Sequence, residues 1–229
     1  SNAVRDDMRA CLPNWPTERI ETLYNRIDIA AVQAEQVSRE AAREQLGLPQ
    51  DAWVVGNVGR LHPDKDQATL IKGFAQALPQ LPAGSLLAIM GSGKLEESLK
   101  SLASELGVSD SVRFLGQVVN GRKYFKAFDV FALTSDHEPF GMVRLEAMAA
   151  GVPVICSDCG GGREVVIDSG RLFPLGAAAV LAQALIEQAQ TTDNLAMLQQ
   201  RMVQRLQTEF SDQAVAQRFR ALPLLNSVM

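Results

Sequence analysis

Hydrophobic residues follow two alternating patterns through the middle of this chain. Short apolar runs, rich in β-branched residues, predict strands over 53–58, 86–90, 112–115, 130–133 and 154–157. Between these runs, apolar positions recur at helical spacing and predict helices over 67–78, 95–106, 123–128 and 141–150. A sixth short strand is expected at Leu172-Phe173. Strands and helices therefore alternate along this part of the chain.

The first 50 residues have a less regular pattern. Residues 4 to about 30 show no clear period, Trp15-Pro16 interrupts them, and Arg19–Tyr24 suits a short strand. Residues 37–46 predict a helix that ends at Gly47, because glycine tolerates the left-handed conformation of a helix end.

The last 50 residues predict helices. From Ala177 onward the spacing is helical almost to the end, with breaks expected near residues 191–193 and 210–211. The apolar side chains of this tail suit packing against the domain more than binding of a partner. They are Leu195, Met197, Leu198, Met202, Leu206 and Phe210.

The strand pattern indicates the fold class. Apolar runs without alternation are typical of parallel strands that are covered on both faces. Together with the intervening helices they predict an α/β fold, a Rossmann-like doubly wound parallel sheet followed by C-terminal helices. With the strand order 3-2-1-4-5-6, the first and fourth strands flank the crevice at which ligands bind. The loops after Val58 and Leu133 are therefore expected to carry the site.

Composition excludes several classes of protein. A hydrophobic share of 47 % argues against intrinsic disorder, and 229 residues can bury a sizeable core. No uninterrupted apolar run approaches the roughly 20 residues that cross a bilayer. A net charge of −4 gives no general attraction to nucleic acid or anionic lipid. Three cysteines are too few for a disulfide framework, which favours a cytoplasmic location.

The loop after Val58 carries two cations. Gly59 lets the backbone approach a ligand, Arg60 offers a planar fork for phosphate oxygens, and Lys65 adds a point charge. This combination suits a diphosphate. A solvated basic loop that pairs with Asp64 and Asp66 is the alternative interpretation.

The loop after Leu133 leads into a helix and carries two carboxylates. Glu138 lies in the turn before the helix, and Glu146 lies in its second turn. Pro139 and Gly141 shape the turn, so the N–H groups of residues 140–143 form an anion-binding helix end. Two carboxylates around such a turn fit a diphosphate between two polyols, which is the layout of a nucleotide sugar. Taken singly, Glu138 is better explained as a dipole-stabilising residue and Glu146 as a solvated helix residue, but their pairing with the cationic loop favours the ligand site.

Together, the two loops resemble the C-terminal, donor-binding domain of retaining GT-B fold glycosyltransferases of family 4. The stretches that carry the resemblance are Val58-Gly59-Arg60-Leu61 with Lys65, Gly91-Ser92-Gly93, Val112–Gly116, Glu138-Pro139-Phe140-Gly141, Leu145–Val154 and Gly161-Gly162 with Glu164. The resemblance implies that the sheet is one half of a GT-B fold.

The resemblance also implies roles for individual residues. Arg60 and Lys65 match diphosphate ligands, and Glu138 matches the glutamate that faces the donor sugar; these three form the expected catalytic set. Glu146 matches the glutamate that holds the ribose diol. The remaining expected donor-binding residues are Gly59, Val118, Phe140, Gly141, Met142 and Val143, with Val118 in the loop that touches the base.

Three positions depart from the family pattern. Asp66 replaces the glycine that often follows the lysine, Arg26 replaces the glycine of the Asn-Gly-Ile-Asp hinge, and Lys94 stands where proline is frequent. Because none of them alters the glutamates or the cations, these departures bear on the donor type and the hinge detail more than on the class of enzyme.

The resemblance implies that the acceptor-binding N-terminal domain is absent from this chain. Residues 1–3 look like a remnant of tag removal, residues 4–30 form an interdomain hinge segment, and residues 31–229 form the donor-binding domain. We therefore expect the isolated domain to be inactive.

The expected reaction is the transfer of a hexosyl group from a UDP- or GDP-sugar to an acceptor hydroxyl, with retention and without a metal or another cofactor. The resemblance suggests a bacterial enzyme of cell-envelope polysaccharide or lipopolysaccharide synthesis. Its acceptor would be a sugar or lipid-linked glycan, and the full-length enzyme would work at the inner face of the membrane. A non-catalytic nucleotide-sugar-binding or regulatory module is the main alternative. A nicotinamide-cofactor domain is disfavoured because the GxGxxG pattern does not occur.

Other motifs carry weaker signals. Cys156 and Cys159 form a Cys-x-x-Cys pair, but the sequence has no second pair for a structural zinc site. His62 and His137 are more simply loop residues than metal ligands. Residues 160–162, three consecutive glycines, resemble an anion-binding nest and are a weaker site candidate.

Overall fold

The computed structural model describes residues 1–191 and 194–222, and its centre is a six-stranded, wholly parallel sheet. The strand order is β3-β2-β1-β4-β5-β6, which is the order that places the first and fourth strands side by side. The strands are β1 (Val54–Val58), β2 (Leu86–Met90), β3 (Val112–Gly116), β4 (Val130–Leu133), β5 (Val154–Ser157) and β6 (Arg171–Phe173). The predicted α/β class is confirmed, including the short sixth strand.

Helices alternate with these strands and continue after the last of them. The α-helices are α1 (Asn2–Cys11), α2 (Ile29–Glu35), α3 (Arg39–Leu46), α4 (Gln67–Ala77), α5 (Glu96–Glu105), α6 (Met142–Ala149), α7 (Gly162–Val166), α8 (Ala178–Gln190), α9 (Leu195–Arg205) and α10 (Asp212–Arg220). Short 3₁₀ segments are η1 (Thr17–Arg19), η2 (Pro63–Lys65), η3 (Leu78–Gln80), η4 (Ser109–Ser111) and η5 (Gly121–Ala127), and η6 (Leu206–Phe210) is a π-helical turn.

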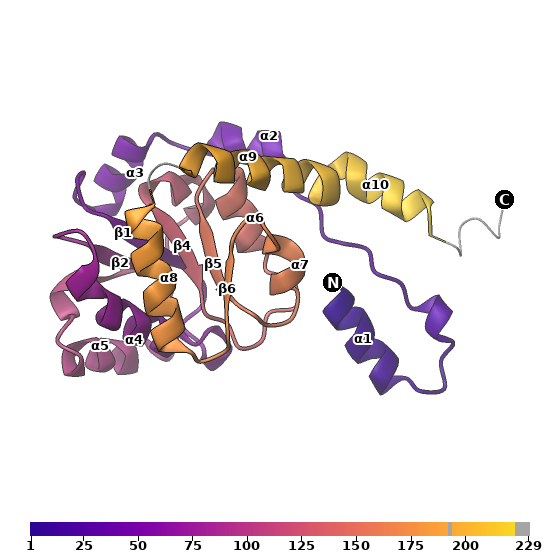
Figure 1. The fold of residues 1–229 in the computed structure, drawn as a ribbon, viewed down its shortest axis with the longest axis horizontal. Helices are drawn as coiled ribbons and strands as arrows, with labels where there is room; N and C mark the ends of the chain where they lie inside the picture. The colour runs from indigo at the N-terminus through magenta and orange to yellow at the C-terminus, as the bar shows by residue number, and fades with distance from the viewer. Residues whose placement is uncertain (192–193, 223–229) are drawn as a thin grey trace.

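The helices cover both faces of the sheet (Figure 1). Helices α4, α5 and α8 bury one apolar core, which includes Phe74 and Leu185. Helices α2, α3, α6 and α9 bury the other, which includes Leu145 and Met202. Successive residues of β1 alternate between them, since Val54 belongs to one core and Val55 to the other. Burial on both faces explains why the strands read as unbroken apolar runs.

The N-terminal part of the chain differs most from the expectation. Arg19–Tyr24 does not form a strand: Thr17–Arg19 is a 3₁₀ turn, and the residues after it are extended but join no ladder in the described structure. A β-propensity becomes a strand only where a neighbouring edge offers hydrogen bonds. Helix α1 begins at Asn2, with Ser1 as its N-cap. The predicted helix over 37–46 begins at Arg39.

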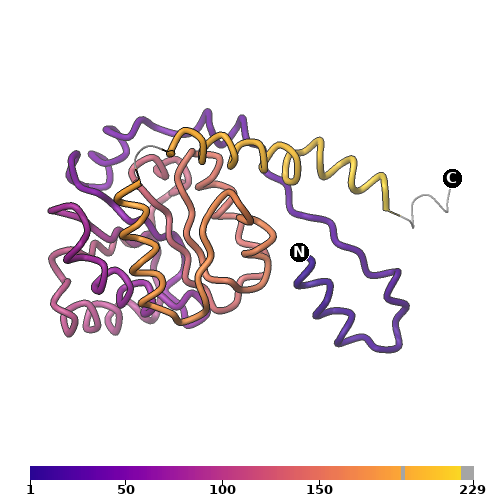
Figure 2. Tube along the Cα trace, in the orientation of Figure 1, coloured from indigo at the N-terminus to yellow at the C-terminus, as the bar shows by residue number. Residues whose placement is uncertain are grey.

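The linker before α2 crosses the C-terminal tail, and both run outward from the same side of the domain (Figure 2). The Ile27 amide donates to the Phe210 carbonyl at 2.8 Å, and Arg26 pairs with Asp212 at 2.6 Å. The break predicted at Phe210-Ser211 is present, because the π-helical turn ends there and Ser211 caps α10. The break predicted near 191–193 falls partly on residues outside the described structure.

Strands β1 and β4 separate toward their carboxyl ends. Their ladder pairs only Val55 with Val130 and Gly56 with Phe131. Beyond it, the buried Asn57 amide Nδ2 donates to the Ala132 carbonyl at 2.8 Å and bridges the widening gap. The loops that leave the two strands therefore open a crevice at the switch point of the sheet. Within the described residues, no helix combines the length and apolarity needed to cross a membrane.

Candidate functional site

The loops after β1 and β4 are joined to each other by hydrogen bonds. The Thr134 hydroxyl donates to the Lys65 carbonyl at 3.0 Å, and the Asp136 amide donates to the Asp64 carbonyl at 3.1 Å. The two loops singled out from the sequence are therefore one structural unit.

Lys65 and Glu138 form an ion pair across this unit. The Lys65 Nζ lies 2.7 Å from the Glu138 Oε2, and the two side chains are only 17 % and 13 % exposed. Attraction between charges is stronger at such sites than at the open surface, because less water screens it. An ammonium that can bind a phosphate oxygen thus lies directly beside a carboxylate that can accept hydrogen bonds from sugar hydroxyls.

Two glycines allow the first loop to pack backbone against backbone. A Cβ at Gly91 would lie 1.9 Å from the Gly59 carbonyl oxygen, and one at Gly93 would lie 2.3 Å from the Leu61 carbonyl oxygen. The Gly59 amide donates to the carbonyl of Met90 at the end of β2, and the Leu61 amide donates to the carbonyl of Ser92 in the loop that follows β2. Any side chain at Gly91 or Gly93 would push the cationic loop out of position.

The glycine run after β5 fixes the turn that carries Glu138. The Gly161 amide donates to the Glu138 carbonyl at 3.2 Å, and a Cβ at Gly160 would lie 2.2 Å from that oxygen. The Gly162 amide donates to the Cys159 carbonyl. These two amides are therefore used within the protein, and the run serves as a support for the turn.

The turn opens helix α6 and leaves backbone donors free. Gly141 adopts a left-handed φ of 81° as the N-cap, and the Arg144 amide donates back to its carbonyl at 3.0 Å. Over residues 1–191 and 194–222, the amides of Met142 and Val143 have no hydrogen-bond acceptor. Free amides at the positive end of a helix dipole suit an anion.

Glu146 is half-buried and lies on α6, one turn after Met142. Burial raises the pKa of its carboxyl above the ordinary value, although Arg122 lowers it, and Glu35 raises it further. Arg122 itself is held by Glu35 through two hydrogen bonds of 2.6 and 2.7 Å. Glu146 is thus a partly desolvated carboxylate beside an already paired arginine.

Arg60 does not join the Lys65–Glu138 pair. Its side chain is 73 % exposed, and its Nη2 lies 3.6 Å from the Asp64 carboxylate. Val118, in the loop expected to touch the base, is half-buried and packs against the core.

Phe140 joins an aromatic cluster that sequence reasoning missed. Its ring centroid lies 5.9 Å from that of Tyr24 in the linker and 5.7 Å from that of Phe210 in the π-helical turn. Tyr24 and Phe210 are 5.3 Å apart. The turn of Glu138 is therefore packed against the linker before α2 and the π-helical turn.

Arg144 is a second residue that sequence reasoning missed. Its side chain is wholly buried, its Nη1 donates to the Phe140 carbonyl at 3.1 Å, and its Nε and Nη2 have no partner in the described structure. The available signal is its position one turn before Met148, on the buried stripe of α6, where a charged residue is out of place.

The cysteines and histidines have ordinary surroundings. Burial raises the pKa of the Cys156 thiol to about 11, which keeps it protonated, and the Cys159 thiol donates to the Ser135 carbonyl. His62 Nδ1 lies 2.6 Å from the Asp64 carboxylate. Within the described residues, no cluster of three or more His, Cys, Asp or Glu side chains is arranged to hold a metal ion.

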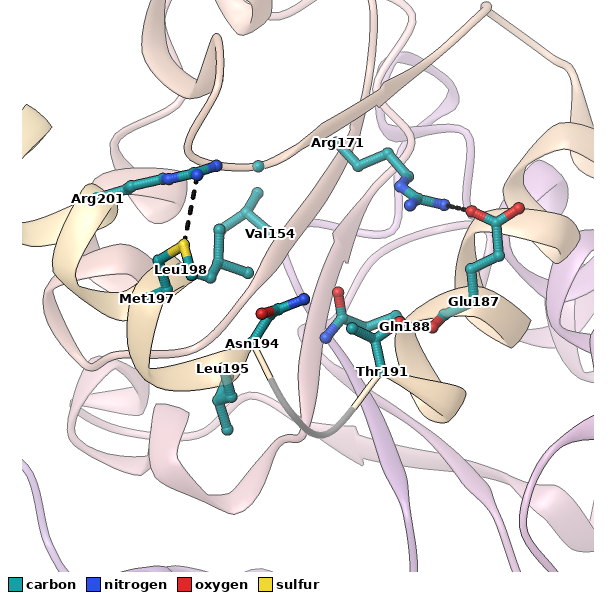
Figure 3. A pocket seen from close by; sticks show the side chains of 11 residues that line it. Val154, Arg171, Glu187, Gln188, Thr191, Asn194, Leu195, Met197, Leu198 and Arg201 are labelled. Atoms are coloured by element: carbon teal, nitrogen blue, oxygen red, sulfur yellow. Dashed lines mark hydrogen bonds and ion pairs between the residues drawn. The ribbon is translucent and has the colours of Figure 1, made fainter.

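A cavity of about 340 Å³ lies away from these loops (Figure 3). Its lining includes Val154 and Arg171, which begin β5 and β6, and side chains from α8 and α9. It therefore opens at the amino ends of the strands, at the opposite edge of the sheet from Lys65 and Glu138.

Comparison with known proteins gives the family. Residues 38–205, more than half of the chain, match the family described as glycosyl transferases group 1, and the chain belongs to it. The lipopolysaccharide core biosynthesis glycosyltransferase LpsE of Rhizobium meliloti is 37 % identical, over 76 % of this chain and 50 % of its own length. The uncharacterized glycosyltransferase MJ1607 of Methanocaldococcus jannaschii is also 37 % identical, over 67 % of this chain and 40 % of its own.

The fold matches solved structures as well. The crystal structure of Anabaena Alr3699/HepE in complex with UDP superposes with a TM-score of 0.84 at 27 % identity, covering 99 % of this chain and 62 % of that one. The resemblance to GT-B glycosyltransferases is thereby confirmed. This chain spans about half or less of the curated relatives it matches.

Proposed function

We propose that this chain is the donor-binding part of an enzyme that transfers a hexosyl group from a UDP-sugar to an acceptor hydroxyl with retention of configuration. The observation that carries the proposal is the 2.7 Å Lys65–Glu138 pair next to the free amides of α6. Family membership and the likeness to a protein crystallised with UDP support it.

Each group of the site then has a part in donor binding. Lys65 and the amides of Met142 and Val143 bind the diphosphate, and the exposed side chain of Arg60 reaches it from solvent. Glu138 accepts hydrogen bonds from the sugar hydroxyls, and Glu146 accepts them from the ribose diol.

The remaining donor contacts extend this arrangement. Gly59, Phe140 and Gly141 supply the close backbone approach, and the loop at Val118 contacts the base.

The same groups explain how transfer would proceed. As the glycosidic bond to the β-phosphate breaks, the cation and amides stabilise the negative charge on the departing diphosphate. An oxygen of that phosphate takes the proton of the acceptor hydroxyl, and the hydroxyl oxygen bonds to the anomeric carbon on the same face. Configuration is retained, and the protein cations perform the charge neutralisation without a metal.

The proposal divides the enzyme into two parts. Residues 31–229 form the donor-binding domain, and residues 4–30 form the hinge segment. An acceptor-binding half outside this chain completes the reaction, so this chain alone binds donor without turnover. By analogy with the Rhizobium relative, lipopolysaccharide or another cell-envelope glycan is the destination, and the complete enzyme works at the inner face of the membrane.

Calorimetric titration of this chain with UDP, GDP and ADP in EDTA tests the proposal. We expect binding of UDP, lost on Lys65→Met and kept on Lys72→Met, which removes an exposed lysine of α4. An absence of heat with all three nucleotides would overturn the proposed function. Binding that requires an added divalent metal would overturn its metal-independent mechanism.

A further inference from the structure

Arg144 presents an unusual combination of burial and unused hydrogen-bond donors. Its guanidinium is fully buried, yet only Nη1 has a partner, the Phe140 carbonyl, while Nε and Nη2 have none in the described parts of the chain. A buried charge without a counter-ion destabilises a fold. Its place in the first turn of α6 adds to the cost, because the N-terminal end of a helix is already positive.

The structure also contains a fully matched buried arginine. Arg43, likewise 0 % exposed, donates through Nη2 to the Asp129 carboxylate at 2.9 Å. Its Nε and Nη1 donate to the carbonyls of Ala127, Pro49 and Gln50. Satisfied burial of an arginine is thus achieved elsewhere in this chain, and the contrast isolates Arg144 as the exception.

The guanidinium of Arg144 lies directly against the turn of the candidate site. A Cβ at Gly141 would lie 3.0 Å from the Arg144 Cζ and 3.1 Å from the Glu138 Cγ, so both side chains lie against Gly141. The Glu138 carboxylate is already engaged by Lys65 at 2.7 Å. Two cations and one carboxylate therefore leave one positive charge in excess in this cluster.

We infer that the missing counter-charge of Arg144 is the diphosphate of the donor, which makes Arg144 a positioning residue for donor binding. Arg144 holds the turn of residues 140–141 in place and adds a favourable electrostatic potential for the diphosphate, without touching the ligand. This inference rests on the proposed function. The excess charge, the unbonded amides of Met142 and Val143 and the helix dipole all favour an anion at the same turn.

The test compares Arg144→Met with Arg43→Met in this chain. Methionine keeps much of the side-chain length and removes the charge. For Arg144→Met we expect a melting temperature of the ligand-free chain equal to or above that of the wild type. We also expect a roughly 10-fold loss of UDP affinity, equal to about 1.4 kcal/mol. UMP affinity should change much less, so the UDP/UMP affinity ratio falls. Arg144→Lys should restore part of that ratio.

The control should show the opposite pattern. Arg43→Met, or Arg43→Lys if the first does not fold, should lower the melting temperature and leave the UDP/UMP affinity ratio unchanged. A melting temperature of Arg144→Met clearly below the wild type, or an unchanged ratio in a wild-type chain that binds UDP, would overturn the inference alone. A wild-type chain that binds no nucleoside diphosphate would overturn the proposed function, and with it the counter-charge assigned here.

Discussion

Lys65 and Glu138 are 73 residues apart in the sequence, yet their charged atoms lie 2.7 Å apart at the end of the sheet. The pair depends on backbone contacts on both sides, since Thr134 holds the Lys65 carbonyl and Gly161 holds the Glu138 carbonyl. It is therefore a product of the loop geometry and not a chance encounter of two long side chains.

Removal of one member of this pair should destabilise the ligand-free chain. We expect Glu138→Gln or Lys65→Met to lower the free energy of unfolding by about 1.5–3 kcal/mol, because each leaves a poorly hydrated charge unpaired. Urea unfolding of the single and double variants measures the coupling. The double variant should lose less than the sum of the two single losses, and strict additivity would show that the pair does not contribute.

Glu146 should give stability a distinct pH dependence. Its folded-state pKa lies above the ordinary value of 4.5 because of burial. Its charged form is thus destabilising at neutral pH, and this penalty disappears as the pH falls through the raised pKa toward 4.5. We expect Glu146→Gln to be more stable than the wild type at pH 7, with the difference shrinking in that window.

Glu187 provides a control of opposite sign. Its pKa is lowered by hydrogen bonds from Gln183 and Arg171 and by the charge of Arg171. Glu187→Gln should therefore be no more stable than the wild type at pH 7. Denaturation curves of both variants between pH 4 and 7.5 measure these stability differences. A gain of stability at pH 7 in both variants would contradict a penalty that comes from the burial of Glu146.

Gly91 should be intolerant of any side chain. Its φ is 144°, and a Cβ there would meet the Gly59 carbonyl oxygen at 1.9 Å. We expect Gly91→Ala to cost on the order of 4 kcal/mol and to abolish UDP binding. Gly84→Ala, at a φ of 77° with no atom within 4 Å, should cost only about 1–2 kcal/mol. Equal costs would mean that backbone strain alone, without the loop contact, is responsible.

The three free thiols should differ sharply in reactivity. Cys11 is exposed, whereas Cys156 and Cys159 are buried, and the pKa of Cys156 is raised to about 11. Titration with a thiol reagent at pH 8 should show one fast thiol, because the thiolate is the reacting form. Cys11→Ser should remove it. A second fast thiol in the native chain would revive a functional role for the Cys-x-x-Cys pair.

Tyr24 should stabilise the turn that carries Glu138. We expect Tyr24→Ala to increase amide hydrogen exchange over residues 138–143, since Phe140 loses one of its two aromatic neighbours. Tyr24→Phe keeps the ring and should not have this effect, nor should Leu23→Ala, which changes an exposed neighbour. Unchanged exchange in Tyr24→Ala would show that the cluster does not support the turn.

The sequence was sufficient for the sheet and insufficient for the termini. Strands buried on both faces leave a strong apolar signal, and the usual order of a doubly wound sheet then singles out the loops that follow β1 and β4. The strand predicted over residues 19–24 is wrong, because β-propensity does not reveal whether a partner edge exists. Spacing along the loop also cannot show that the Arg60 side chain turns toward Asp64 and solvent while Lys65 turns toward Glu138.

The sequence does contain a signal at Arg144, which is a charged residue at a buried position of α6. Arg144 interrupts a buried helical stripe, but which carbonyls and carboxylates are near enough to satisfy it depends on how α6 and α7 meet. Likewise, Tyr24 and Phe210 are separated by most of the chain, and no local pattern indicates that both rings touch Phe140.

That three-ring contact has a practical consequence for anyone who trims this chain. A fragment that starts at α2 removes Tyr24, and one that stops before the π-helical turn removes Phe210. Either cut would leave the ring of Phe140 facing water at the entrance of helix α6. The segments that carry Tyr24 and Phe210 thus stabilise the turn at the crevice. A fragment whose boundaries follow the sheet alone would have a less stable candidate site.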